Sequence, residues 1–252
     1  MLNSRIDWCD STWNPVTGCN HGCEYCYARG IANRFGCHAT PNDKVSVVIH
    51  PWEDSETGRK LPYPYDFSPT LHKYRLNEYE GKKGRNIFVC SMADLFGDWV
   101  PLDWQLEVFK ACRKAPQHNY LFLTKNPGMY AVMDEQGELP TDSNMWFGTS
   151  VTTPDEPFPY NGKNKYNLFL SIEPLLADFG AGSEGALKDI GWVIIGAETG
   201  HRNGKVVPEK SWVDNIVTQC KAHNIPVFMK KSLRAFYGDE LLREFPKGLI
   251  RG

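Results

Sequence analysis

Three cysteines lie close together near the start of the chain. Cys19, Cys23 and Cys26 fall within eight residues, at the spacing C-x3-C-x2-C. Three thiolates on one short loop can each hold one iron of a 4Fe-4S cluster, which leaves the fourth iron without a protein ligand. Such an iron can bind another molecule. The spacing therefore predicts a metal centre with an open coordination position.

The same thiolates fit other kinds of metal site. Zinc prefers four tetrahedral sulfur or nitrogen ligands, and His21 or His38 could supply the fourth. A cluster that stabilises a binding module or carries electrons, without catalysis, is a further alternative. A disulfide framework is weaker, because eight cysteines in a chain with no export signal are more typical of metal ligands and free thiols.

Length and composition set the class of protein. The 252 residues fit one large domain, and a parallel α/β barrel or partial barrel reaches this size. A net charge of -2 argues against a strongly basic protein that wraps nucleic acid. The first residues form no apolar signal region, and no stretch approaches the ~18 consecutive apolar residues of a membrane span. We therefore expect a cytoplasmic protein that has no membrane partner.

From Asn86 onward, short apolar runs of strand length alternate with segments of helical pattern. This alternation predicts parallel strands joined by crossover helices. A further strand is expected at 12–16, leading into the cysteine loop, and a helix at 28–35 follows the loop. We predict one domain over 1–252, with an α/β fold of the partial (βα)6 TIM-barrel type. The expected strands are 87–90, 120–123, 145–148, 167–170, 192–195 and 227–229, and the expected helices are 102–114, 127–134 and 208–223.

Other segments have no regular pattern. The stretch at about 38–85 is an irregular insertion with one β-like run at 45–49. A structureless insertion of this length is unusual in a compact domain, so we expect it to pack over the core or to cover a site. The segments after Ser150 and Glu173 contain several prolines or glycines, and they predict loops with short helices.

Polar side chains follow every strand-like run from Asn86 onward. In a parallel barrel the carboxyl ends of the strands meet at one face, which is where such folds place their active sites. The simpler alternative is that strands end in polar residues wherever they reach the surface. The candidates, in chain order, are Ser91, Asp94, Lys125, Ser150, Glu173, Glu198 and Lys230.

Cys90 ends the first of these runs and has two interpretations. It could act as a catalytic thiol that donates a hydrogen atom at the active face. It could also be a small core residue, since free cysteine commonly packs in this way.

The cysteine loop, with aromatic Tyr25 just before the third cysteine, resembles the signature loop of radical S-adenosylmethionine enzymes. From Asp7 to Lys231, the chain is similar to a phage-associated radical S-adenosylmethionine-like family. More distantly, 91–94 and 123–125 are similar to the strand ends of spore photoproduct lyases, which repair DNA. The segments that carry the family likeness are WNPVTGC (13–19), GCEYCYA (22–28), IFVCSMADLF (87–96), LTK (123–125), SIEPL (171–175) and IGAETG (195–200).

This resemblance implies a barrel of the radical S-adenosylmethionine kind. Cys19, Cys23 and Cys26 would hold a 4Fe-4S cluster, and S-adenosylmethionine would bind its open iron. One electron from the cluster would break the carbon-sulfur bond, and a 5'-deoxyadenosyl radical would then abstract a hydrogen atom from the substrate. A one-electron reductant of the flavodoxin or ferredoxin type is therefore the expected partner.

The resemblance also implies roles by position at the strand ends. Tyr25 would lie near the adenine, and Lys125 would pair with the carboxylate of the methionine. In the wider superfamily a Gly-Gly-Glu motif follows the second strand. This chain has no such motif there, and residues 91–94 occupy its position. The full set expected to bind the cofactor is Tyr25, Ser91, Asp94, Lys125, Ser150, Glu173 and Glu198.

The substrate class is the least defined expectation. A nucleic acid or nucleotide would fit aromatic residues near the mouth of the barrel, because bases stack on aromatic rings. The basic run at 230–234 could meet phosphate groups. The aromatic candidates are Trp13, Tyr27, Phe96 and Trp99.

Overall fold

The computed structural model describes most of the chain. The predicted loops after Ser150 and Glu173, and the two ends of the predicted domain, lie partly outside the described residues. The described residues are 4–39, 45–156, 160, 162, 164–180, 187, 189–199 and 202–249.

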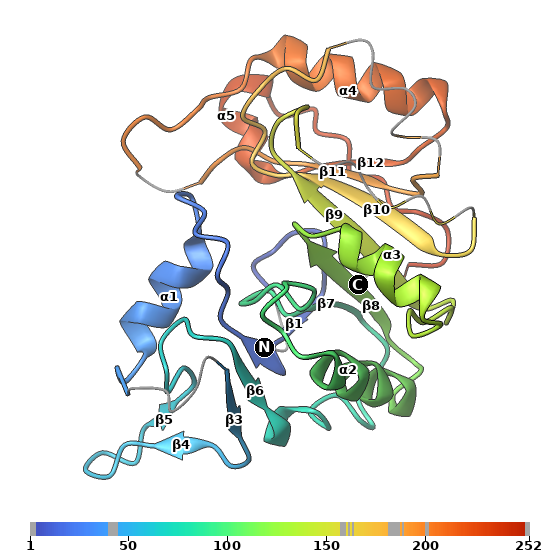
Figure 1. Cartoon of the computed structure of the whole chain (residues 1–252). Helices are drawn as coiled ribbons and strands as arrows, with labels where there is room; N and C mark the ends of the chain where they lie inside the picture. Colours follow the sequence, from blue (N-terminus) through green and yellow to red (C-terminus); the bar gives the residue numbers. More distant parts are fainter. Residues whose placement is uncertain are drawn as a thin grey trace.

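A seven-stranded sheet forms the centre of the molecule (Figure 1). Its order is β1-β7-β8-β9-β10-β11-β12, and every neighbouring pair is parallel. The sheet is curled as a half-barrel, which confirms the α/β class and the partial barrel. It has one strand more than the (βα)6 type, because the N-terminal strand adds to the six that follow Asn86. The strands are β1 (Ser11–Trp13), β7 (Asn86–Val89), β8 (Asn119–Thr124), β9 (Met145–Val151), β10 (Asn167–Ile172), β11 (Val193–Ile195) and β12 (Val227–Met229).

Apolar residues cover both faces of this sheet, as parallel strands require. Neighbouring residues of one strand point to opposite faces, so Leu121 and Phe122 belong to different core clusters. The larger cluster includes Val108, Tyr130 and Val213, which come from the three crossover helices. These helices therefore cover one face. They are α2 (Leu102–Lys114), α3 (Gly128–Glu135) and α4 (Lys210–Ala222), within two residues of their predicted bounds.

The predicted first strand at 12–16 is wrong at its end. β1 stops at Trp13, and β2 (Val16–Thr17) pairs antiparallel with β6 (Thr70–His72) in a separate small sheet. Pro15 has no N–H to donate to a ladder. Asn14 turns toward the end of β7, where its Oδ1 accepts hydrogen bonds from Met92 N (3.0 Å) and Ser91 Oγ (3.2 Å).

The insertion at about 38–85 has structure of its own. Its small sheet has the order β2-β6-β3, and it packs beside the main sheet through Arg75, whose carbonyl accepts from Trp13 Nε1 at 2.9 Å. The β-like run predicted at 45–49 corresponds to β3 (Ser46–Val48). The other elements of the insertion were not predicted. They are β4 (Trp52–Glu53), β5 (Lys60–Leu61), β6 (Thr70–His72) and the 3-10 helix η1 (Lys73–Arg75).

Three short helices complete the described chain. α1 (Tyr27–Phe35) follows the cysteine loop, one residue longer than predicted. The 3-10 helix η3 (Lys231–Leu233) and α5 (Arg234–Tyr237) follow β12. Within the described residues, no helix is long and apolar enough to cross a membrane.

Candidate functional site

The cysteine loop starts where β2 passes between the end of β7 and the insertion. Gly18 has a φ of +89° and donates from its N–H to the carbonyl of Met92 at 2.9 Å. A Cβ atom at this position would lie 2.2 Å from the carbonyl oxygen of Ser68. The next amide, of Cys19, donates to the carbonyl of Phe67 at 3.2 Å. Only glycine fits this close approach, so Gly18 fixes the place where the loop begins.

The loop ends at the first turn of α1. Cys26 caps the helix, and its Sγ accepts from the Arg29 amide at 3.4 Å. The Arg29 guanidinium reaches back to the carbonyl of Cys19, with Nη2 at 3.3 Å. Cys19, Cys23 and Cys26 are all partly buried, and none forms a disulfide. One arginine therefore ties the first cysteine to the last.

The three thiols are of a type that binds metals, but their side chains do not converge on one point. Among the described residues, no group of three or more His, Cys, Asp or Glu side chains is placed to hold a metal ion. Burial raises the pKa of Cys19 to about 12, and the nearby Asp94, Cys23 and Cys26 add to the increase. Metal binding would need these side chains to turn and Cys19 to lose its proton. The donor set fits a cluster in number and chemistry.

Asp94 joins the cysteine loop to the strand ends. It is buried, and its Oδ2 accepts from the Lys125 amide at 2.9 Å and lies 2.7 Å from His21 Nε2. Its Oδ1 accepts from the Phe96 amide at 3.0 Å. Both carboxylate oxygens are thus bonded within the protein, and they hold the ends of β7 and β8 against the loop.

Tyr25 lies against the ends of β8 and β9. Lys125 Nζ is 5.6 Å from the centroid of its ring. Burial raises the pKa of Tyr25, while Lys125 and Thr152 act in the opposite direction. The Lys125 ammonium is buried and is not hydrogen-bonded to any described residue. The described part of the chain therefore offers this buried cation the Tyr25 side chain and no carboxylate.

The two predicted serines bond within the protein. Ser91 Oγ donates to Asn14, and the Ser91 carbonyl accepts from the Tyr27 hydroxyl at 2.8 Å. Ser150 Oγ donates to the carbonyl of Glu173 at 3.4 Å. Ser91 therefore lies beside the loop, and Ser150 lies beside the end of β10.

Cys90 is a core residue at the end of β7. It is 2% exposed, belongs to the larger core cluster and has a φ of +57°. Burial raises its pKa to about 12. Core packing accounts for its position, and its role as a hydrogen donor stays a prediction.

Glu173 and Lys230 form an ion pair across the sheet edge. They follow β10 and β12, and Gly196 follows the strand between them. A Cβ atom at Gly196 would lie 2.9 Å from Lys230 Cδ and 3.3 Å from Glu173 Cδ. Glycine therefore lets the pair close over the end of β11. The basic run at 230–234 is partly neutralised, because Arg234 also pairs with Asp239 at 2.8 Å.

Arg202 links the loop to the far half of the sheet, and sequence reasoning missed it. Glu198 is 4% exposed, and Arg202 binds both its oxygens, with Nε–Oε1 at 2.8 Å and Nη2–Oε2 at 2.9 Å. The guanidinium lowers the pKa of Glu198. Arg202 Nη1 also reaches Glu24 Oε2 at 3.3 Å, within the cysteine loop. In Figure 1 the chain after β11 approaches the loop before α1. In the sequence, only the i,i+4 spacing of Glu198 and Arg202 could have suggested this ion pair.

The two histidines considered for zinc have carboxylate partners. His21 faces Asp94, and its ring packs edge-on against Trp99 at 4.8 Å between centroids. His38 Nδ1 lies 2.9 Å from Asp66 Oδ2, and the His38 side chain is largely exposed. Each histidine uses only one ring nitrogen in these contacts, and a metal-binding histidine commonly bonds a carboxylate through its other nitrogen, so the zinc alternative stays open.

A cavity of about 400 Å³ lies away from the loop, between α2 and the segment 137–141. Both of its basic lining residues are already paired. Arg113 binds Asp142 at 3.0 Å, and Lys165 binds Asp134. This cavity therefore does not belong to the candidate site.

Comparisons with known proteins add a family and one distant structural likeness. None of the curated proteins matches the sequence. A mutant of spore photoproduct lyase is similar in structure, with a TM-score of 0.45 and 10% identity, over 90% of this chain and 80% of that one. A likeness at this level carries no argument about function. The family model described as "Protein of unknown function (DUF5131)" matches residues 3–241, and the chain belongs to this family.

Proposed function

We propose that the protein is a radical S-adenosylmethionine enzyme with a barrel of that kind. Cys19, Cys23 and Cys26 would bind a 4Fe-4S cluster, and the enzyme would take a hydrogen atom from its substrate. The observation that carries the proposal is the position of three free thiols on one loop at the carboxyl ends of parallel strands. Parallel barrels place their chemistry at this edge.

The cysteines would hold three irons and leave the fourth for the amino and carboxylate groups of S-adenosylmethionine. When bound and reduced, the cluster supplies the electron that breaks the carbon-sulfur bond. The protein supplies position and exclusion of water. Arg29, Asp94 and Arg202 support this role, because each joins the loop to another part of the site.

Lys125 is the best candidate to bind the cofactor's carboxylate. Its ammonium is buried without a hydrogen-bond partner among the described residues, and such a group is costly unless an anion meets it. Tyr25 beside it offers a ring on which a planar base can pack. Ser91, Ser150, Glu173 and Glu198 complete the proposed neighbourhood of the cofactor.

A nucleic acid or nucleotide remains the proposed substrate class. Of the predicted aromatic residues, Trp13 and Phe96 are core residues at 2% and 0% exposure and cannot stack on a base. Of the other two candidates, Trp99 packs its ring against His21, and Tyr27 is 52% exposed on the surface of α1. The association with phages likewise stays a prediction.

Anaerobic reconstitution followed by spectroscopy tests the proposal. We expect a brown protein with about four irons. Adding S-adenosylmethionine should change the paramagnetic resonance spectrum of the reduced cluster. A spectrum that does not respond would favour an iron-sulfur protein without radical catalysis. A colourless protein that carries one zinc and unfolds with chelator would favour a zinc-stabilised binding module.

A further inference from the structure

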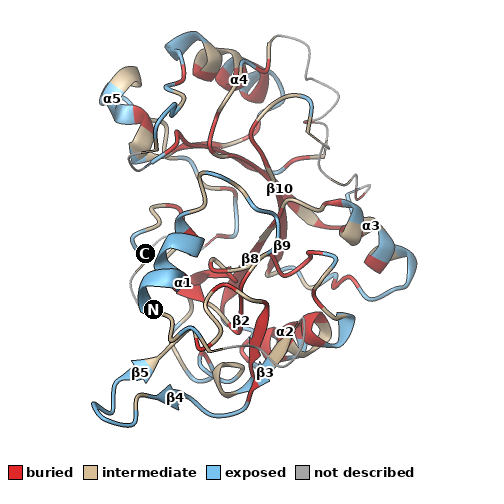
Figure 2. Cartoon of the chain, turned by 60° about the vertical axis from the view of Figure 1, so that its left-hand side comes forward, coloured by how far each residue is buried: buried red, intermediate tan, exposed pale blue. Residues whose placement is uncertain are grey.

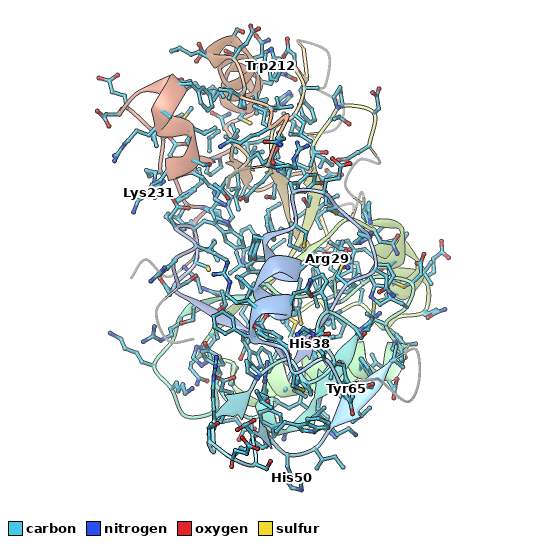
Figure 3. The ribbon with its side chains drawn as sticks, turned by 90° about the vertical axis from the view of Figure 1, so that its left-hand side faces the viewer. Arg29, His38, His50, Tyr65, Trp212 and Lys231 are labelled. Carbon is cyan, nitrogen blue, oxygen red and sulfur yellow. The ribbon has the colours of Figure 1, made fainter. Side chains whose placement is uncertain are left out.

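The outer surface of α1 carries an apolar stripe beside the cysteine loop. Tyr27, Ile31 and Phe35 are spaced four residues apart, so they share one face of the helix. They are 52%, 36% and 39% exposed. Figure 3 looks at this side of the molecule, with α1 at the front, and Figure 2 shows most of α1 in the exposed colour.

The helix is weakly buried for one that carries so many apolar residues. Only Ala28 and Ala32 are buried, and they pack with Phe67 and Met92 in a small cluster. A surface helix normally turns its larger apolar residues toward the core. In α1 the small residues face the core, while Ile31 and Phe35 face outward and Tyr27 exposes its ring with its hydroxyl held on the Ser91 carbonyl. Contiguous exposed apolar residues of this kind mark interaction sites.

The stripe has positive charge along its edge. Helical geometry places Arg34 next to Ile31 on the exposed side, and no ion pair joins Arg34 to another described residue. Arg59, from the hairpin of β4 and β5, lies over the Phe35 ring at 5.8 Å. The helix itself contains no Asp or Glu. The charge therefore favours an acidic partner.

The position of the stripe beside the cysteine loop indicates what role a docked partner would have. The stripe begins at Tyr27, directly after Cys26, so a protein docked on it would lie next to the proposed cluster. The substrate side is different, because Tyr25 and Lys125 face the strand ends. Electron transfer falls steeply with distance, so an electron donor docked on the helix that Cys26 caps would be well placed to reduce the cluster.

We propose that the Tyr27-Ile31-Phe35 stripe docks a small acidic electron-transfer protein, and this inference rests on the proposed function. The partner loses one electron and the cluster gains one, with no bond made or broken in the transfer. Nine residues at 1.5 Å each make α1 about 13 Å long. Such a small patch suits the transient electron-transfer complexes, which bury little area.

A flavodoxin is the probe for this surface. Binding is titrated at low salt, and cleavage is then driven either by photoreduced flavodoxin or by dithionite. Ile31→Glu should raise both the Kd and the half-saturating flavodoxin concentration about tenfold. Arg34→Glu should raise them less, and it should weaken their dependence on salt. Dithionite-driven cleavage should not change in either variant.

Val132→Glu is the matched control, because Val132 is an exposed apolar residue at 44% exposure on α3. It should bind flavodoxin as the wild type does. Unchanged flavodoxin binding in Ile31→Glu and Arg34→Glu would overturn the proposed docking surface. Cleavage driven by dithionite in the same variants would still support the proposed enzymatic function. Loss of single-stranded oligonucleotide binding in Ile31→Glu, with flavodoxin binding intact, would assign the stripe to nucleic acid and also overturn it. Absence of cleavage with dithionite is a separate failure, that of the proposed function.

Discussion

The cysteine loop and the strand ends beside it are built in opposite ways. At the strand ends, Asp94, Glu173 and Glu198 all have partners within the protein, and Asp94 and Glu198 are buried. In the loop, three partly buried thiols have no disulfide. The α1 helix that follows is mostly exposed.

This difference separates a bonded frame from thiols that no disulfide ties down. Functional groups need support that locks their geometry, and the paired carboxylates supply such support. The loop is attached to that frame through Gly18, His21 and Glu24, and its three cysteines form no disulfide. Four substitutions can break or sharpen this comparison.

Replacing a loop thiol should have the largest effect. Cys19→Ser should lower the iron content from about four to near zero, because soft thiolate ligands select iron-sulfur clusters. Cys37→Ser is the control. Cys37 lies outside the loop, and its Sγ donates to the carbonyl of Pro64, which a hydroxyl can also do. Equal iron loss in both variants would mean that the ligands are not those of the loop.

The attachment of the loop is tested by two glycines with similar backbone angles. Gly18→Ala should lower the free energy of unfolding by about 3 kcal/mol, because the new Cβ would collide with the Ser68 carbonyl. Gly22 has a φ of +73° but nothing within 4 Å of its Cβ position. Gly22→Ala should therefore cost only about 1 kcal/mol, from the left-handed backbone alone. Denaturant unfolding compares them, and equal losses would show that Gly18 is not a packing constraint.

The frame is tested at Asp94. Asp94→Asn should lower the free energy of unfolding by about 2 kcal/mol, because an amide cannot accept both the Lys125 and Phe96 N–H groups as the carboxylate does. Asp98→Asn is the control. Asp98 is exposed, and among the described residues it bonds the side chain of Asn126 alone, so Asp98→Asn should lower the free energy of unfolding by no more than about 0.5 kcal/mol. Equal losses of unfolding free energy in the two variants would show that the frame does not depend on Asp94.

For a change of one pH unit, the smallest effect concerns the strand pair that leads into the loop. His72 is fully buried, and its Nε2 lies 2.8 Å from Thr17 Oγ1. Burial lowers the pKa of His72 to about 2, whereas an unfolded histidine titrates near about 6.5. As the pH falls below that value, the unfolded chain takes up a proton and the folded one does not.

Stability should then fall by up to about 1.4 kcal/mol per pH unit. His72→Gln should remove this share of the slope. Unfolding free energies at pH 7, 6 and 5 measure it, and parallel slopes for the two proteins would contradict the burial of a neutral histidine.

The regular part of the fold could be predicted because buried parallel strands leave continuous apolar runs. The run at 227–229 matches β12, and 102–114 matches α2. The strand predicted at 12–16 failed, because Asn14 leaves the sheet to bond the end of β7. Nothing local in the sequence indicates that choice.

The cysteine loop could be singled out from the sequence, but its connections to the rest of the site could not. The spacing of the three cysteines indicates a metal loop without any knowledge of the fold. The contact between Arg202 and Glu24 joins residues 178 positions apart, and only the folded chain brings them together. Asp94 was expected to face the cofactor, yet its oxygens bond Lys125, Phe96 and His21. The position of a residue at a strand end predicts where its side chain lies, but it does not predict which group the side chain bonds.

Reductive cleavage of S-adenosylmethionine is the most direct test of the central claim. Wild-type protein is reconstituted to about four irons, reduced with dithionite under anaerobic conditions and incubated with S-adenosylmethionine. We expect release of 5'-deoxyadenosine, and we expect Cys19→Ser to release none. A wild-type protein that carries a full complement of iron and releases no 5'-deoxyadenosine would contradict the proposed function.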